Sequence, residues 1–202
     1  MLTVLIPATE TRLTQVDTIK AEIDVTDAGQ DLEIGALIDQ QSAAIRSFLS
    51  RVLARETVRQ TERVSGEATL ILERRPVAEV VGVTVDGAAL DPADFERDGA
   101  LLRRLCNDRP SLWWGKVAVD YAAGWRMPGE TGRDLPEDIE RACIDLCVRA
   151  YHARGRDPAL RSYENPDVEK MSWSASDSVK TVDGLPEDIA GRLGGYRLVT
   201  IA

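Results

Sequence analysis

The chain has almost no histidine and little cysteine, which removes much of the usual chemistry of enzymes. Its 202 residues include one histidine, His152, and three cysteines. A histidine-dependent catalytic triad or a multi-histidine metal site therefore lacks the residues it needs. The sequence also contains no G-x-G-x-x-G, G-x-x-x-x-G-K or G-x-S-x-G motif. These absences predict a protein without a cofactor, a metal or a catalytic residue.

The cysteines show no C-x-x-C spacing. Cys143 and Cys147 stand four residues apart on a predicted helix, where they share a face, and Cys106 lies far from both. Two thiols and His152 form an incomplete set of zinc ligands. Small buried cysteines on an apolar helix face explain the pattern better.

Long hydrophobic runs are missing as well. No apolar run approaches the ~20 residues of a membrane span. The first seven residues lack the basic region and the long apolar region of a signal peptide, so we expect an intracellular origin. With 44% hydrophobic residues, the composition is that of a soluble globular protein with one core and an appendage.

Acidic residues are in excess, and much of that excess is local. The formal net charge is −9, and the segment from residue 17 to residue 39 holds seven acids and one base, Lys20. This composition argues against a phosphate-binding surface there. It fits either an ordinary solvated helix surface or an acidic face with a function of its own. The candidate residues of this acidic face are Asp24, Asp27, Asp31, Glu33 and Asp39.

Three helices are predicted before the C-terminal segment. Thr14, with Asp17 three residues later, predicts the capped start of the first. Apolar residues with a 3.6-residue period predict a long second helix from about residue 34 to residue 53 and a third that begins at 135–138. The second and third helices are expected to pack together. Their apolar positions are Ile34, Leu37, Ile38, Ile45, Phe48, Leu49 and Val52, and Ile139, Ala142, Cys143, Leu146, Cys147, Ala150 and Tyr151.

Residues 55–125 change to strand-like patterns. Residues 55–64 alternate with a polar side, which predicts a strand at a sheet edge or a subunit boundary. Further strands are predicted at 68–72, 77–85, 101–105 and 116–122, with a tight turn at Asp86-Gly87. On the strand predicted at 77–85, Val77, Val81, Val83 and Val85 are expected on one face. The fold class is therefore α+β, with a mainly antiparallel sheet inserted between helices.

The C-terminal stretch Asp157–Ala202 carries few large apolar residues and no sustained period. Such a segment is expected to remain loose or to become ordered on a partner. It holds 5 Lys or Arg residues against 8 Asp or Glu residues, so a partner would be protein and not nucleic acid. A loose terminus and a docking arm both fit this pattern. We therefore divide the chain into a helical core, 1–156, and a C-terminal arm, 157–202, with a short terminal helix.

The order of these pieces resembles a known family. The carrying motifs are Leu13-Thr14-Gln15-Val16, Leu72–Val77 with Val80–Gly87, Asp120–Trp125 followed by Leu135–Ile139, and Leu185-Pro186 through Leu193 to Tyr196-Arg197. Over nearly its whole length the chain resembles the head–tail connector (adaptor, or head-completion) proteins of long-tailed phages and phage-like gene transfer agents. Residues 172–179 depart from the family, because they lack the glycine expected in its C-terminal hairpin.

The resemblance implies a structural protein of the particle neck that is made in the bacterial cytoplasm. Connector subunits form a ring, usually twelve-fold, between the portal and the stopper or tail proteins, and DNA passes through without sequence-specific binding. On this reading the arm docks on the portal, and the acidic face lines the channel or an intersubunit contact. The expected portal-docking residues are Trp173, Leu193, Tyr196, Arg197 and Leu198.

Two other functions stay open at this point. A stopper or tail terminator would serve in the same particle, but those proteins are usually β-barrel-like, whereas the longest patterns here are helical. A small carboxylate-dependent enzyme would need a pair such as Asp134 with Glu137 or Glu187 with Asp188. These acids stand in predicted first turns of helices, where carboxylates are favoured for structural reasons.

Overall fold

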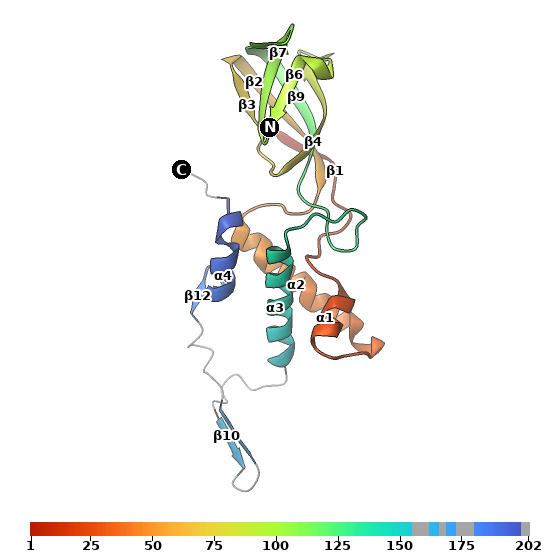
Figure 1. Ribbon diagram of the computed structural model, residues 1–202, viewed down its shortest axis with the longest axis vertical. Coiled ribbons are helices and arrows are strands. Elements are labelled where there is room, and N and C mark those ends of the chain that lie inside the picture. Colours follow the sequence, from red (N-terminus) through yellow and green to blue (C-terminus); the bar gives the residue numbers. More distant parts are fainter. Residues whose placement is uncertain (155–161, 166–168, 173–179, 199–202) are drawn as a thin grey trace. The chain divides into compact units, whose positions relative to one another are not determined.

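The computed structural model describes residues 1–154, 162–165, 169–172 and 180–198. Its helices and antiparallel sheets confirm the α+β class (Figure 1). The chain divides into two compact units that are interleaved in sequence. The sheet unit comprises residues 1–11 and 52–134, and the helical unit comprises residues 12–51 and 135–202.

The sheet unit contains two antiparallel sheets. The first has the strand order β1-β2-β9-β4-β5, and the second has the order β3-β7-β6 with β8 also paired to β7. Asp86 and Gly87, at φ angles of 50° and 87°, form the predicted tight turn between β4 and β5. The strands are β1 Leu2–Ile6, β2 Glu56–Glu67, β3 Thr69–Ile71, β4 Val77–Val85, β5 Ala88–Ala89, β6 Phe95–Asp98, β7 Leu101–Cys106, β8 Arg109–Ser111 and β9 Trp113–Ala123, with a 3-10 turn, η2, at Pro92–Asp94.

The core of the sheet unit takes its side chains from both sheets. Val117, Val119 and Tyr121 of β9 are buried as the alternation predicts, and Trp113 donates a hydrogen bond from Nε1 to the Leu102 carbonyl at 3.2 Å. Gln60 is also buried, and its side chain is satisfied because Oε1 accepts hydrogen bonds from the Tyr121 hydroxyl and the Glu73 amide, both at 2.9 Å. The buried side-chain oxygen of Gln60 therefore has hydrogen-bond partners, as buried polar groups require.

Two expectations for the sheet unit are wrong. The edge position predicted for residues 55–64 is wrong where β1 pairs with residues 57–60 of β2 on the side away from β9, and the alternative of a subunit boundary stays a prediction. Val81 is 62% exposed and does not share the inward face of Val83. The physical reason is a pair of register shifts in β4, after Val77 and after Val80, which reverse the alternation along the strand.

The described residues of the helical unit form four α-helices. Figure 1 shows α3 between α4 and α1, and these helices and α2 bury a common apolar core. The elements are α1 Val16–Glu22, η1 Ala28–Gln30, α2 Asp31–Leu49, α3 Glu137–His152, the paired strands β10 Ser162–Asn165 and β11 Glu169–Ser172, the short strands β12 Thr181–Val182 and β13 Leu185–Pro186, α4 Glu187–Leu193 and η4 Gly194–Tyr196.

The helix predictions are confirmed in their main points and corrected at their ends. α2 and α3 pack together, with Ser42 Oγ 3.7 Å from Cys143 Sγ. α2 ends at Leu49, earlier than expected, because Ser50 adopts a left-handed φ of 53°. The predicted cap of α1 is wrong: Thr14 is buried, and its hydroxyl donates to Glu140 Oε1 at 3.4 Å and caps nothing. Within the described residues, no helix is both long enough and apolar enough to span a membrane.

Candidate docking surfaces

The end of the chain packs on its own helices. Leu185, Ile189 and Leu193 are at most 2% exposed, and α4 lies against α3. The spacing of four residues places these three side chains on one face of the segment. The expectation that the whole stretch 157–202 lacks packing within its own chain is therefore wrong for residues 180–198.

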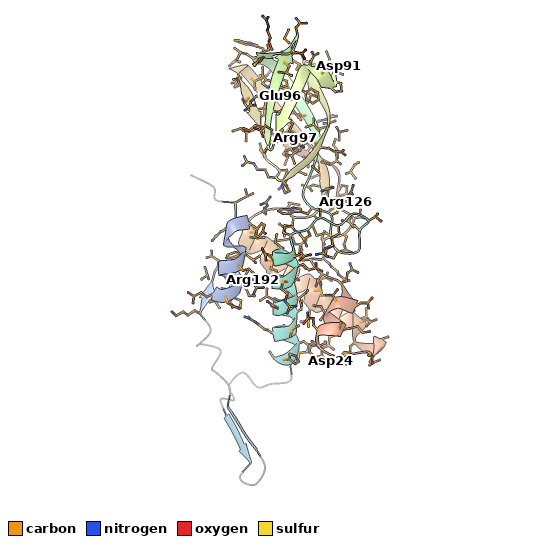
Figure 2. The ribbon with its side chains drawn as sticks, in the orientation of Figure 1. Asp24, Asp91, Glu96, Arg97, Arg126 and Arg192 are labelled. Atoms are coloured by element: carbon orange, nitrogen blue, oxygen red, sulfur yellow. The ribbon has the colours of Figure 1, made fainter. Side chains whose placement is uncertain are left out.

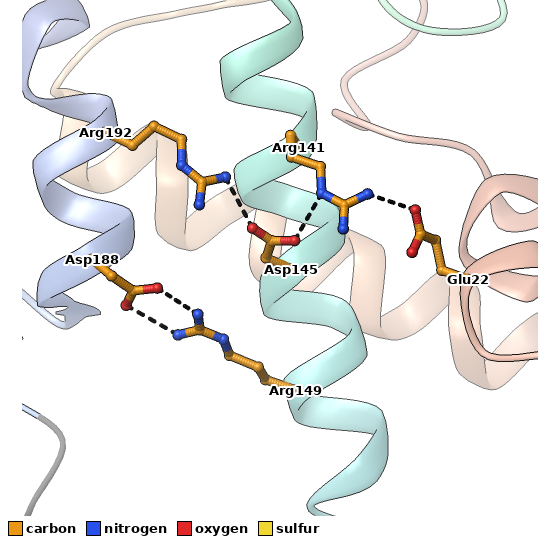
Figure 3. Close-up of polar contacts among 6 residues, drawn as sticks. All are labelled: Glu22, Arg141, Asp145, Arg149, Asp188 and Arg192. Carbon is orange, nitrogen blue, oxygen red and sulfur yellow. Dashed lines mark hydrogen bonds and ion pairs between the residues drawn. The ribbon is translucent and has the colours of Figure 1, made fainter.

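Ion pairs connect α4 to α3 (Figure 3). Arg149 of α3 makes a two-pronged contact with Asp188 of α4, and Arg192 of α4 meets Asp145 of α3 at 2.9 Å. Arg141 continues this network to Asp145 and to Glu22 of α1. We call these six residues the charged clasp. Because its members are mostly half-exposed, each pair contributes at most about 1 kcal/mol, and the buried apolar stripe supplies most of the attachment.

The charged clasp is expected to make the attachment of α4 to α3 depend on pH. The hydrogen bond from Arg149 holds the pKa of Asp188 below its usual value of 3.8. A lowered carboxyl pKa stabilises the folded state above that value, and the contribution is lost as the pH falls through the folded pKa. The protection of amides in residues 187–193 against hydrogen exchange is therefore expected to fall as the pH drops below ~3.8. Asp188→Asn should remove this acid sensitivity. If the variant and the parent chain respond alike, the clasp does not hold α4.

The residues after α4 also contact other parts of the helical unit. Arg51 Nη1 donates to the Tyr196 carbonyl at 3.1 Å, and the Leu198 amide donates to the Leu49 carbonyl at 3.2 Å. The guanidinium of Arg197 lies 5.2 Å from the centre of the Phe48 ring. Arg197 and Leu198 therefore lie against the last turn of α2.

The five expected portal-docking residues thus fall into three groups. Leu193 is fully buried in its own chain, so its side chain is not free to enter a partner. Arg197 and Leu198 contact α2, whereas Tyr196 bonds to Arg51 and, through its hydroxyl, to Asp138 of α3. All three keep part of their surface accessible. Trp173 lies outside the described residues. The contact of the tail with α2 was missed because nothing local in the sequence marks it.

The five candidates for the acidic face lie on the helical unit, and three of them are paired with a base. Asp31 meets Lys20 at 2.7 Å, Glu33 meets Arg154 at 2.6 Å and Asp39 meets Arg12 at 2.8 Å. The hydrogen bond from Arg12 lowers the pKa of Asp39. The charge of this face is therefore smaller than its count of acids suggests.

Asp24 and Asp27 carry the remaining charge. Within the described ranges neither makes an ion pair with a base. Asp24 stands in the turn after α1 with a φ of 53° (Figure 2), and Asp27 Oδ1 accepts from the Gly29 amide at 2.9 Å at the start of η1. These two side chains are exposed, so they are the part of the acidic face that is available to a neighbour.

Cys143, Cys147 and His152 all lie on α3. Cys143 and Cys147 are buried on α3, and a hydrogen bond with Cys143, together with burial, raises the pKa of the Cys147 thiol. His152 packs edge-on against Tyr151 with 5.7 Å between ring centres. Among the residues that the structure describes, no three His, Cys, Asp or Glu side chains gather in a way that would hold a metal ion.

Comparisons with known proteins agree with the resemblance seen in the sequence. The family model of the head completion proteins matches residues 12–157. Three solved chains match over 100% of this chain and 97% of their own length. They come from the neck of an empty gene transfer agent particle computed with C6 symmetry (17% identity, TM-score 0.55), the virion of a native gene transfer agent particle (15%, 0.58) and the neck of a native particle computed with C12 symmetry (18%, 0.55). No curated protein sequence matches the chain.

Proposed function

Because the chain belongs to the head completion protein family, we propose that it is a structural component of the neck of a phage-like particle, where it forms a ring between portal and tail. The observation that carries this proposal is the family match over residues 12–157, which includes α1, α2, α3 and strands β2 to β9. The fold shared over full length with chains of gene transfer agent necks supports it. The role is structural, without catalysis.

The ring is supported by the symmetry of the related particles. Necks that contain chains of this fold were computed with C6 and C12 symmetry. A closed ring needs two different surfaces on each subunit, which meet head to tail. Electron microscopy of particles made with and without this chain tests the proposal. We expect a missing ring of density and tailless heads without the chain, and complete necks without it would overturn the proposal.

Docking on the portal is assigned to the C-terminal arm, 157–202, with α4 as its fixed base. Leu193 no longer counts among the anchors, because it is buried in its own chain. Trp173 and the accessible parts of Tyr196, Arg197 and Leu198 remain. Tryptophan, tyrosine and arginine are the residues that most often carry the binding free energy of an interface.

Tryptophan substitutions test this assignment. Trp173→Ala is expected to weaken capture of the chain by portal complexes about 30-fold, which corresponds to ~2 kcal/mol. Trp114→Ala is the matched control, because Trp114 is 56% exposed in the sheet unit. Equal capture of both variants and the parent chain would contradict a docking role for the arm.

The acidic face is proposed to border the DNA channel or an intersubunit contact. An acidic surface does not neutralise phosphates, so DNA passes without being retained. Asp27→Lys is expected to disturb DNA packaging or ejection from assembled particles. Asp91→Lys is the control, because Asp91 caps η2 as Asp27 caps η1, each through an acceptor 2.9 Å from the amide two residues later. Identical DNA behaviour of the two variants would remove the proposal.

A further inference from the structure

The first strand of the chain lies at the edge of its sheet. β1 pairs with β2 on one side, and no strand among the described residues pairs with it on the other. Val4, Leu5 and Ile6 are 44%, 43% and 63% exposed, and Met1 is 85% exposed. This is an unusual concentration of exposed apolar side chains for five or six successive residues.

The backbone of β1 is also free to pair. The Met1 amine and carbonyl both bond to Thr61, so Met1 and Thr61 form a hydrogen-bonded pair at 2.8 Å in each direction. Bonded and non-bonded pairs alternate in an antiparallel ladder, and Leu2↔Gln60 and Val4↔Val58 are then the non-bonded ones. The amide and carbonyl groups of Leu2 and Val4 consequently point away from β2, and no described residue bonds to them.

Natural sheets usually protect such an edge with lysine, proline or a covering segment. The residues of β1, Leu-Thr-Val-Leu-Ile, include no charged residue and no proline. A register shift between Val4 and Ile6 is the one protective feature, and it lies at the end of the strand. An edge of this kind is suited to the addition of a further strand from another chain.

The same chain contains a segment that lacks a supporting strand. β10 and β11 pair with each other from Ser162↔Ser172 to Asn165↔Glu169 and form a two-stranded sheet of their own. A two-stranded hairpin is at best marginally stable in water, and it gains stability from a third strand or a packing surface. Within the described residues, the chain therefore has a sheet edge that is open to a further strand and a hairpin with no third strand.

We propose that the β10–β11 hairpin of one subunit adds to the β1 edge of a second copy of the chain and extends its five-stranded sheet. The inference rests on the proposed ring, which brings identical copies side by side, and it assigns the two surfaces that meet head to tail. The hairpin then joins neighbouring subunits, and residues from Trp173 onward remain for the portal.

Cysteine cross-linking in assembled particles tests the contact directly. All chains carry Cys106→Ser, since Cys106 is the one exposed cysteine in the described part of the chain. One chain adds Leu5→Cys and the other adds Met171→Cys, or Lys170→Cys for the opposite face of β11. Oxidation is expected to give a covalent dimer only when both chains are present. Complete necks without a dimer for either pairing would overturn the inference and leave the ring intact, whereas the absence of a ring would overturn both.

A charged edge residue provides a second measurement. Val4→Lys places a cation on the open edge and is expected to lower the yield of cross-linked dimer about tenfold, which corresponds to ~1.4 kcal/mol of association free energy. Val81→Lys is the matched control, because Val81 is 62% exposed and lies on a different strand, β4. An equal yield from both variants, with unchanged circular dichroism, would contradict pairing at β1.

Discussion

Leu193→Ala is expected to lower the free energy of unfolding by about 2–5 kcal/mol, although Leu193 lies nine residues from the end of the chain. Its side chain is fully buried on the face of α4 that also carries Ile189. Truncation to alanine leaves a cavity that the packed helices fill only in part. Urea unfolding followed by circular dichroism measures the loss.

Val182→Ala is the control for this result. Val182 precedes α4 and is 42% exposed, so its truncation should change the free energy of unfolding by no more than about 0.5 kcal/mol. Should Leu193→Ala unfold at the same urea concentration as Val182→Ala, α4 would not belong to the core of the helical unit. Removal of all residues after Arg156 tests docking less cleanly than Trp173→Ala does, because it also removes α4, which packs in the core of the helical unit.

Gly124→Ala is expected to destabilise the sheet unit by about 3 kcal/mol or more, as the sum of backbone strain and overpacking. Gly124 has a φ of 98°, and a Cβ atom there would lie 2.5 Å from the Ala54 carbonyl oxygen. The neighbouring backbone is fixed by hydrogen bonds from the Trp125 amide to the Leu53 carbonyl at 2.7 Å and from the Arg55 amide to the Trp125 carbonyl at 2.8 Å. The atoms nearest to the added Cβ belong to the backbone, so a change of side-chain rotamer cannot relieve the clash.

Gly191→Ala provides the comparison for Gly124. Gly191 lies in α4, and a methyl group added there would meet no neighbouring atom within 4 Å, so alanine should be neutral or stabilise the helix by about 0.5–1 kcal/mol. Thermal unfolding of the two variants measures the difference. A Gly124→Ala chain as stable as the parent would mean that the two carbonyl groups beside Gly124 do not approach it as described.

The elements that the sequence predicts well are those with strong local signals. The apolar period of α3 and the alternation of β9 each extend over many residues, and both elements form where expected. The turn at Asp86-Gly87 is also local, because the residue types themselves favour positive φ angles. Each of these features depends on neighbours in sequence, so no knowledge of the rest of the fold is needed to find it.

The missed features depend on residues that are distant in sequence. β1 pairs with residues 57–60, and its five residues, four of them apolar, carry no period that would mark them as a strand. The register shifts of β4 leave no trace in the composition. The clasp joins residues separated by 39, 47 and 119 positions. The spacing of Leu185, Ile189 and Leu193 is the one local sign that the terminal helix packs on its own chain.

The interleaving of the two units has a consequence for synthesis. The first strand emerges from the ribosome about fifty residues before its partner β2, and the intervening residues belong to the helical unit. The helical unit in turn lacks α3 and α4 until the sheet has been made. The sheet unit can therefore be completed during translation once residue 134 has been made, whereas the helical unit must wait for α3 and α4.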